Sequence, residues 1–235
     1  MQYIGITEAG DPSFNFKWVD KLYDANIIIS KNLNDRLIEE LINHKEKIIF
    51  HCTCTGMGGT IIEPNVPNVG YTRNQLLKLV DKGFPQKQIV LRIDPIIPTA
   101  KGLETVENIL YTFKTLGIKR VRYSFLDMYK HVKTRFIGAN VRLPYWNFNP
   151  SQNMINNALE LFKKYPEYEF ESCAENTPHK LGCISQKDLD ILGVDIKPVE
   201  GGLQRKGCLC LGNKKELLSS KKRCMNKCLY CYWKD

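Results

Sequence analysis

Residues 89–95 read Ile-Val-Leu-Arg-Ile-Asp-Pro, an apolar run of strand length that contains and ends in ionisable side chains. Similar β-like runs recur at residues 3–6, 27–29, 48–50, 121–126 and 168–173, with a weaker one at 194–199. Between the runs, apolar residues follow helical spacing at 33–42, 76–80, 103–113 and 154–162. Alternating strands and helices pair in parallel through crossover connections. We therefore expect an α/β fold, a complete or partial (β/α) barrel of six to seven units, with an open sheet as the alternative.

Polar side chains follow nearly every predicted strand, where this fold class gathers its functional groups. They are Thr7 and Glu8, then Thr53 and Thr55, then Arg92 and Asp94, then Ser124 and Asp127, then Cys173 and Glu175. For any single residue, contact with solvent at the end of a strand is an equally good explanation. Several of these groups lie inside β-like sequence, however, where an unpaired charge is costly, and the whole set therefore favours a shared site.

The basic charge of the chain is concentrated near its carboxyl end. The formal net charge is +9, and residues 197–235, with ten Lys or Arg against three Asp or Glu, account for +7 of it. Five of the nine cysteines lie in the same stretch. We expect a (β/α) barrel at residues 1–199 and a cysteine-rich basic tail at 200–235 that folds back on it. No apolar run approaches a membrane span and no secretory signal is evident, so we expect a cytoplasmic protein with few disulfides.

The sharpest motif is Cys224-Met-Asn-Lys-Cys228-Leu-Tyr-Cys231, a C-x3-C-x2-C spacing with Tyr230 before the last cysteine. Three close thiolates can bind three irons of a 4Fe–4S cluster and leave the fourth iron open. A zinc knuckle that adds Cys208 or Cys210 is the alternative. Unligated core cysteines fit poorly with the polar, basic surroundings.

This spacing, with its aromatic residue, resembles the motif of the radical S-adenosylmethionine (SAM) enzymes. More of the chain resembles an uncharacterised radical-SAM-like family with a C-terminal CxxxCxxC motif, distantly similar to spore photoproduct lyase. The resemblance is carried by Thr53-x-Thr55, residues 63–67, 92–95, 124–129, 173–175, Cys183-Ile184, 204–210 and 228–232. The chain departs from the family pattern at residues 6–12. Only four residues follow Cys231, so a radical-SAM barrel would here be circularly permuted.

The resemblance implies a radical-SAM enzyme of oxidoreductase or lyase type. SAM would chelate the open iron, and reduction of the cluster would cleave SAM to a 5′-deoxyadenosyl radical that abstracts hydrogen from an unknown substrate. Arg92 could bind the SAM carboxylate, and Asp94, Glu63 or Glu175 its amine or ribose hydroxyls. The remaining candidates are Ser124, Asp127 and Tyr129 toward the substrate, Gln204 and Arg205 toward SAM or as a tail anchor, and Tyr230 and Tyr232 beside the cluster. An internal ion pair between Arg92 and Asp94 is the alternative.

The family pattern also includes Cys173, Cys183, Cys208 and Cys210. Together they could bind a second 4Fe–4S cluster or a structural zinc that fastens the tail to the barrel, or they could be buried, unligated thiols. Cys52 and Cys54 are interpreted as core or strand-end cysteines.

The basic tail and the aromatic loop at residues 136–150 indicate which partners the protein could bind. The tail could bind an acidic reductant such as flavodoxin or ferredoxin, bind DNA or RNA, or be a solvated surface. Arg142, Tyr145, Trp146 and Phe148 could stack on bases or simply anchor the loop. The alternative function is a non-catalytic zinc or iron–sulfur nucleic-acid-binding protein. A metal-dependent hydrolase is disfavoured, because the chain has only four histidines and no metal-helix pair.

Overall fold

A computed structural model describes residues 2–197, 199, 208–218 and 223–234. The strands are β1 (Ile4–Ile6), β2 (Ala25–Ser30), β3 (Ile48–Thr53), β4 (Ile89–Ile96), β5 (Arg120–Phe125), β6 (Glu169–Ser172) and β7 (Lys214–Glu216). The α-helices are α1 (Asp35–Asn43), α2 (Val69–Asp81), α3 (Ala100–Phe113), α4 (Lys130–Gly138), α5 (Gln152–Lys163) and α6 (Gln186–Leu192). Short 3-10 turns occur at Pro12–Phe14, Phe16–Lys21, Lys45–Lys47, Gln86–Gln88 and Lys114–Leu116.

The seven strands form one parallel sheet in the order β6-β5-β4-β3-β2-β1-β7. Strands β1 to β6 follow their order in the sequence, so each crossover moves the chain one strand in the same direction. Right-handed crossovers of this kind place the connecting helices on one face and curl the sheet toward the other. The sheet is a partial (β/α) barrel, because no ladder joins β6 to β7 in the described part of the chain. This confirms the predicted fold class.

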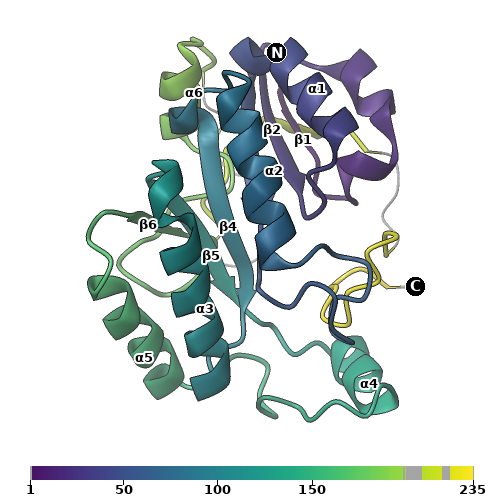
Figure 1. The fold of residues 1–235 in the computed structure, drawn as a ribbon, viewed down its shortest axis with the longest axis vertical. Coiled ribbons are helices and arrows are strands. Elements are labelled where there is room, and N and C mark those ends of the chain that lie inside the picture. Colours follow the sequence, from purple (N-terminus) through teal and green to yellow (C-terminus); the bar gives the residue numbers. More distant parts are fainter. Residues whose placement is uncertain (1, 198, 200–207, 219–222, 235) are drawn as a thin grey trace.

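Helices α1, α2, α3 and α5 cover the outer face of the sheet (Figure 1). The main apolar core lies beneath them and includes Leu37, Leu76, Ile109 and Phe162. Each of these helices begins at a side chain that accepts a hydrogen bond from the first turn, namely Asn34, Asn68, Thr99 and Ser151. The four predicted amphipathic segments are therefore confirmed as helices, although α1 begins two residues later than predicted and α2 begins seven residues earlier.

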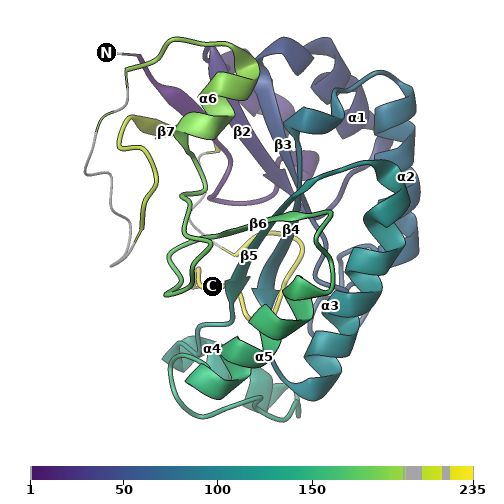
Figure 2. The ribbon, with the colours of Figure 1, turned by 90° about the vertical axis from the view of Figure 1, so that its left-hand side faces the viewer.

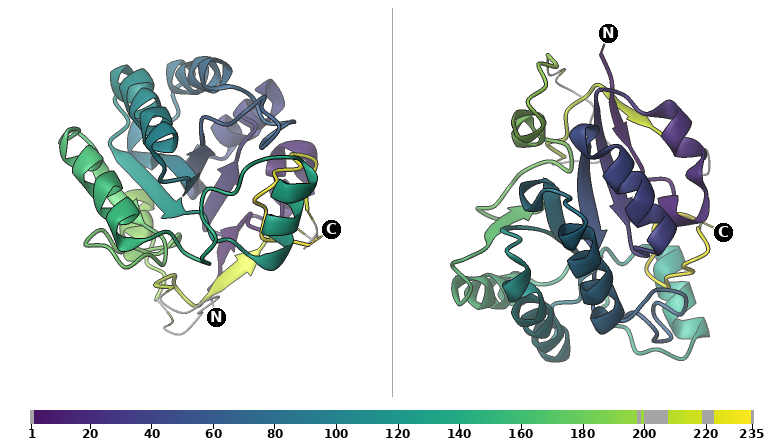
Figure 3. Two further views of the ribbon diagram at one scale, coloured as in Figure 1. Left: turned by 90° about the horizontal axis from the view of Figure 1, so that it is seen from below. Right: turned by 45° about the horizontal axis from the view of Figure 1, so that its top comes forward.

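Helix α6 lies on the opposite, inner face (Figure 2). There Ile184 and Leu189 pack with strand residues such as Ile27 and Ile49 in a smaller apolar cluster. The C-terminal tail lies beside α4, beyond the carboxyl ends of the strands (Figures 1 and 3).

Three local predictions differ from the structure. The described residues of 194–199 form no strand, and β7 instead supplies the seventh strand beside β1. The sequence Lys-Lys-Glu gives no apolar signal, because a short edge strand is held by backbone pairing with its neighbour. Helices α4 and α6 were not predicted, since each buries only two residues and the helical pattern is correspondingly weak. Residues 136–138 of the predicted loop belong to α4.

The inner face changes character along the strands. In the register of the sheet, Val90 pairs with Arg120, Arg92 with Arg122, and Arg122 with Glu171. Successive side chains on one face of a strand are two residues apart. An apolar floor is therefore followed by a layer of arginines and acids, and then by Asp94, Ser124 and Cys173 at the strand ends.

Candidate functional site at the strand ends

A cavity of about 460 Å³ lies at the carboxyl ends of the strands and beneath the tail. Its wall combines strand-end groups with residues of the tail, so neither segment forms the cavity alone. The predicted residues that line it are Thr7, Glu8, Thr53, Arg92, Asp94, Ser124, Asp127, Tyr129, Cys173, Cys183, Cys224, Cys228, Tyr230, Cys231 and Tyr232. Residues separated by as many as 225 positions, Thr7 and Tyr232, are thus brought to one site.

Asp94 is the central acceptor of the strand-end wall. Its carboxylate accepts hydrogen bonds from the Ser124 hydroxyl and from the Arg92 guanidinium. Arg92 also points a second nitrogen at the Cys183 sulfur, 3.5 Å away. The ion pair that the sequence offered as an alternative is therefore formed, and it leaves Arg92 and Asp94 side by side in the cavity wall.

A buried carboxylate, Glu63, holds the tail against the barrel. Tyr230 donates its hydroxyl hydrogen to Glu63, and Thr55 donates to the other carboxylate oxygen at 2.6 Å. The Lys31 ammonium lies 3.1 Å from Glu63. Burial alone would lower the pKa of Lys31, but Glu63, together with Cys228 and Asp94, offsets this and raises it, so the ammonium remains charged. The tail is thus fastened to a buried ion pair.

A second carboxylate, Asp11, fastens the tail at another point. The Asn226 side-chain amide donates to Asp11 at 2.8 Å, and Ser30 donates to the other oxygen at 2.7 Å. From the far side, the Arg135 guanidinium of α4 donates to the Cys231 and Trp233 carbonyls at 2.6 and 2.8 Å. These side-chain contacts to backbone and amide groups position residues 224–231 over the cavity.

The three tail cysteines share the cavity wall. Burial raises the pKa of each thiol, and that of Cys228 to about 12, with the nearby Lys31 opposing the rise. The thiols are therefore protonated at neutral pH unless a cation replaces the proton, as a bound metal does. Among the residues the structure describes, no three His, Cys, Asp or Glu side chains are spaced to hold a single metal ion.

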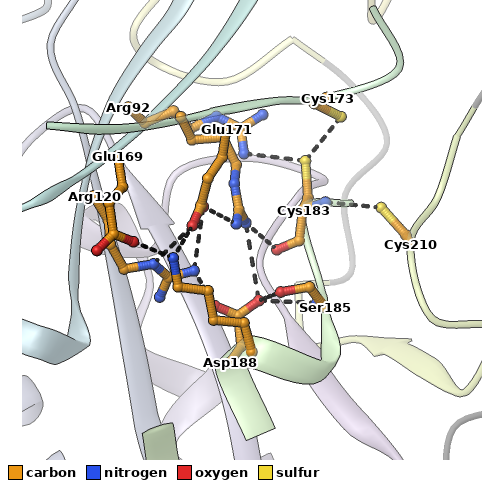
Figure 4. Close-up of polar contacts among 11 residues, drawn as sticks. Arg92, Arg120, Glu169, Glu171, Cys173, Cys183, Ser185, Asp188 and Cys210 are labelled. Carbon is orange, nitrogen blue, oxygen red and sulfur yellow. Dashed lines mark hydrogen bonds and ion pairs between the residues drawn. The ribbon is translucent and has the colours of Figure 1, made fainter. Parts of the chain in front are cut away.

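The other four predicted cysteines also come together. Cys183, Cys208 and Cys210 are buried and pack with Cys173 as one cluster. The Cys183 and Cys173 sulfurs are 3.0 Å apart, and the Cys183 backbone N–H donates to the Cys210 sulfur at 3.1 Å (Figure 4). Cys173 and Cys183 also line the cavity, so the two cysteine sets lie on the same opening.

An ionic layer supports this cluster from below (Figure 4). Glu171 binds both Arg120 and Arg122, and Asp188 of α6 binds Arg120 at 2.7 Å. Arg122 donates to the Cys183 carbonyl at 2.9 Å, which fixes the loop that carries this cysteine. Burial and the neighbouring guanidiniums hold the pKa of His51 well below its usual range, so His51 is neutral. The layer connects α6 to the sheet and positions Cys183.

Some predicted residues lie away from the cavity wall. Glu63 is fully buried under Tyr230, and Glu175 accepts a hydrogen bond from the Phe125 backbone N–H at 2.9 Å. Gln204 and Arg205 lie outside the described residues. Cys52 and Cys54 lie in the outer apolar core.

Sequence reasoning missed Asp11, Lys31 and Asn226, which hold or line the site. Asp11 stands in the strand-end segment that follows β1, so its position after a strand was the available signal. Lys31 directly follows β2 and had the same signal, whereas Asn226 has none, because its partner Asp11 is distant in sequence.

A partial (β/α) barrel with a cavity at the carboxyl ends of its strands is an arrangement typical of many enzymes. Residues 16–233 match a family described as a domain of unknown function, DUF1848, and the chain belongs to this family. No curated protein matches the chain. A solved psychrophilic glycoside hydrolase family 10 endo-β-1,4-xylanase is 10% identical, covering 81% of this chain and 78% of its own, with a TM-score of 0.26. That likeness is too low to inform function, and neither description mentions radical-SAM chemistry. The described helices include none long and apolar enough to cross a membrane.

Proposed function

We propose that the protein is a radical-SAM enzyme whose 4Fe–4S cluster is held by Cys224, Cys228 and Cys231. The single observation that carries the proposal is that this C-x3-C-x2-C segment lies over a cavity at the strand ends of a parallel barrel. Three cysteine ligands leave one cluster position for SAM, which would occupy the cavity. The barrel would then be a circularly permuted form of the radical-SAM barrel, with the motif at its end.

The residues present fit these groups. Three thiols within eight residues, Cys224, Cys228 and Cys231, match the donor set of a cluster with an open position and would hold it as thiolates. The cavity volume of about 460 Å³ suits a ligand of the size of SAM. When both groups are bound, the reduced cluster supplies one electron that cleaves a carbon–sulfur bond of SAM, giving methionine and the 5′-deoxyadenosyl radical.

The chain's own residues would bind SAM and orient it in the cavity. Arg92, whose terminal nitrogens contact Asp94 and Cys183 in the structure, would also bind the SAM carboxylate through its guanidinium. Asp94, held by Ser124 on one oxygen, would accept a hydrogen bond from the amine or a ribose hydroxyl. Tyr230 and Tyr232 would shield the cluster from water. Glu63 and Glu175 support the wall, since each is engaged by protein groups.

We also propose a cytoplasmic location and an acidic protein as the reductant. Exposed basic residues of the tail, such as Lys227, would attract an acidic electron donor such as flavodoxin or ferredoxin. A reduced cytoplasm suits the free thiols.

The deciding experiment reconstitutes the protein without oxygen, counts iron and sulfide, and adds dithionite and SAM. We expect 5′-deoxyadenosine and methionine to form in equal amounts. Cys224→Ala, Cys228→Ala and Cys231→Ala should each abolish cleavage, whereas Cys52→Ala, a buried core cysteine, should not. A cluster that neither binds nor cleaves SAM would contradict the proposal.

A second candidate function is nucleic-acid binding, either as the substrate interaction of the enzyme or on its own. Trp146 is 73% exposed and Phe148 is 45% exposed, the exposed Arg142 lies in the same loop, and the Lys133 ammonium donates to the Trp146 carbonyl. Tyr129, at the start of α4, lines the cavity and contacts the Phe148 ring edge to face, with centroids 4.9 Å apart. Exposed aromatics beside basic groups can stack on bases of a single strand while the cations meet its phosphates. DNA or RNA is therefore the substrate class favoured by this surface.

A further inference from the structure

We propose that Cys173, Cys183, Cys208 and Cys210 form a second metal centre with four thiolate ligands, separate from the three tail cysteines. Its metal is a zinc ion or an iron–sulfur cluster, since both use the same tetrathiolate chemistry. This site does not depend on radical-SAM activity.

Four thiols from three separate segments of the chain converge at this site. Cys173 follows β6, Cys183 precedes α6, and Cys208 and Cys210 lie in the segment before β7. All four belong to one cluster, and Cys183, Cys208 and Cys210 are each no more than 6% exposed. Cysteines that only fill an apolar core pack among aliphatic side chains, as Cys52 and Cys54 do in the outer core. These four contact one another instead.

A close backbone approach at Gly182 brings the Cys183 segment and the Cys208–Cys210 segment together. A Cβ atom added to Gly182 would lie 2.6 Å from the backbone of Leu209 and Cys210. Only glycine therefore allows the Cys208–Cys210 segment to lie directly against Cys183. The backbone bond from Leu211 N–H to the Ile184 carbonyl, at 3.1 Å, continues this pairing. Gly182 therefore lets the segment that carries Cys183 pack directly against the segment that carries Cys208 and Cys210.

A guanidinium and a backbone N–H lie close to the sulfurs and could stabilise their negative charge. Four thiolates around a divalent cation carry a net charge of −2, which needs cations or N–H donors nearby. The Arg92 guanidinium lies 3.5 Å from the Cys183 sulfur, and the Cys183 N–H donates to the Cys210 sulfur at 3.1 Å. Arg122 holds the Cys183 carbonyl, while its Nε is buried without a hydrogen-bond partner among the described residues. Donors to sulfur of this kind stabilise thiolates and tune bound metals.

Two of the sulfurs lie closer together in this structure than the ligand sulfurs of a bound zinc ion would. The Cys173 and Cys183 sulfurs are 3.0 Å apart. Zinc–sulfur bonds of about 2.3 Å at tetrahedral angles separate ligand sulfurs by about 3.8 Å. The two thiols must therefore rotate apart as the metal enters. Binding of one zinc ion by four thiols releases up to four protons and requires no oxidant or reductant.

The test uses the full-length Cys224→Ala/Cys228→Ala/Cys231→Ala variant, which keeps the proposed site and removes the tail triad. It is produced with zinc and iron supplied, purified without oxygen, and assayed for zinc, iron, acid-labile sulfide and free thiols. We expect about one zinc, or about four irons with sulfide, per chain. Zinc gives a colourless protein whose cobalt(II) form shows tetrahedral thiolate absorption, whereas a cluster gives a brown protein. A metal-free protein overturns the proposal, whether its thiols are all free or two are joined as a disulfide.

Gly182→Ala, made in the same variant, tests the geometry without removing a ligand. We expect metal retention against a chelator to weaken by about tenfold or more, because the added methyl group displaces Cys210. Gly138→Ala is the matched control, since an added Cβ there meets nothing within 4 Å. Equal retention in the two glycine variants would overturn the proposed assembly. Failure of the wild-type protein to cleave SAM would leave these metal counts unaffected, so the two proposals fail separately.

Discussion

Tyr230→Phe isolates one of the bonds that hold the tail on the barrel. The substitution keeps the ring in place and removes only the hydroxyl that donates to the buried Glu63 carboxylate. Thr55 and Lys31 still hold that carboxylate, so the loss is confined to one hydrogen bond to a charged acceptor. Such a bond contributes about 1.5–3 kcal/mol. A loss of about 2 kcal/mol corresponds to a roughly thirtyfold increase in the open form of the tail.

Hydrogen exchange followed by mass spectrometry measures this opening directly. The Leu229 N–H donates to the Ile62 carbonyl at 2.9 Å, so its exchange reports on the docked tail. We expect exchange in residues 223–234 to accelerate about thirtyfold while β3 and β4 remain protected. Tyr71→Phe is the control, because the Tyr71 hydroxyl makes only an exposed contact with Gln75 at 3.3 Å. Unchanged exchange in the tail would refute the assignment of Glu63 as its anchor.

Three further predictions concern the ionic layer, the cavity and the exposed aromatics. Asp188→Asn should lower the free energy of unfolding by about 3 kcal/mol in urea titrations, because it leaves the buried Arg120 underpaired; a loss no larger than that of the exposed Asp190→Asn would contradict this. Asp94→Asn should weaken SAM binding about tenfold in calorimetry while leaving the iron count intact, and loss of iron instead would mean that Asp94 supports the cluster. Trp146→Ala should weaken binding of a single-stranded oligonucleotide by about fivefold or more in fluorescence anisotropy; equal affinity would exclude stacking on this side chain.

The strands and outer helices were predictable because their burial is repetitive. Runs such as residues 89–93 are buried on both faces, and the face of α1 that includes Leu37 and Leu41 repeats at helical spacing. β7 and α6 were missed because they depend on a few tertiary contacts with distant segments. The three residues of β7 pair with β1, and α6 is held by Leu189 together with the Asp188–Arg120 ion pair.

For the candidate site, the sequence supplied the residue types but not their partners. The rule that strand ends carry function pointed to Asp94 and Ser124, and both line the cavity. The same rule grouped Glu175 with them, yet its carboxylate is engaged by the Phe125 backbone. A strand-end position specifies the edge of the sheet, whereas the direction of a side chain there depends on the loop that follows.

The sequence by itself determined the parallel α/β architecture and singled out the C-x3-C-x2-C segment at Cys224–Cys231, because hydrophobic periodicity and close cysteine spacing are local properties of the chain. The grouping of the other four cysteines was implied only by the family resemblance. Only the tertiary structure decided that the tail lies over the strand ends and that Cys173 and Cys183 meet Cys208 and Cys210. It did so through buried contacts between residues far apart in sequence, such as Tyr230 with Glu63, Asn226 with Asp11, and Gly182 with the Cys210 backbone. A hydrogen bond or a close backbone approach at such separation leaves no periodic trace, since it depends on how the elements pack and not on their local pattern.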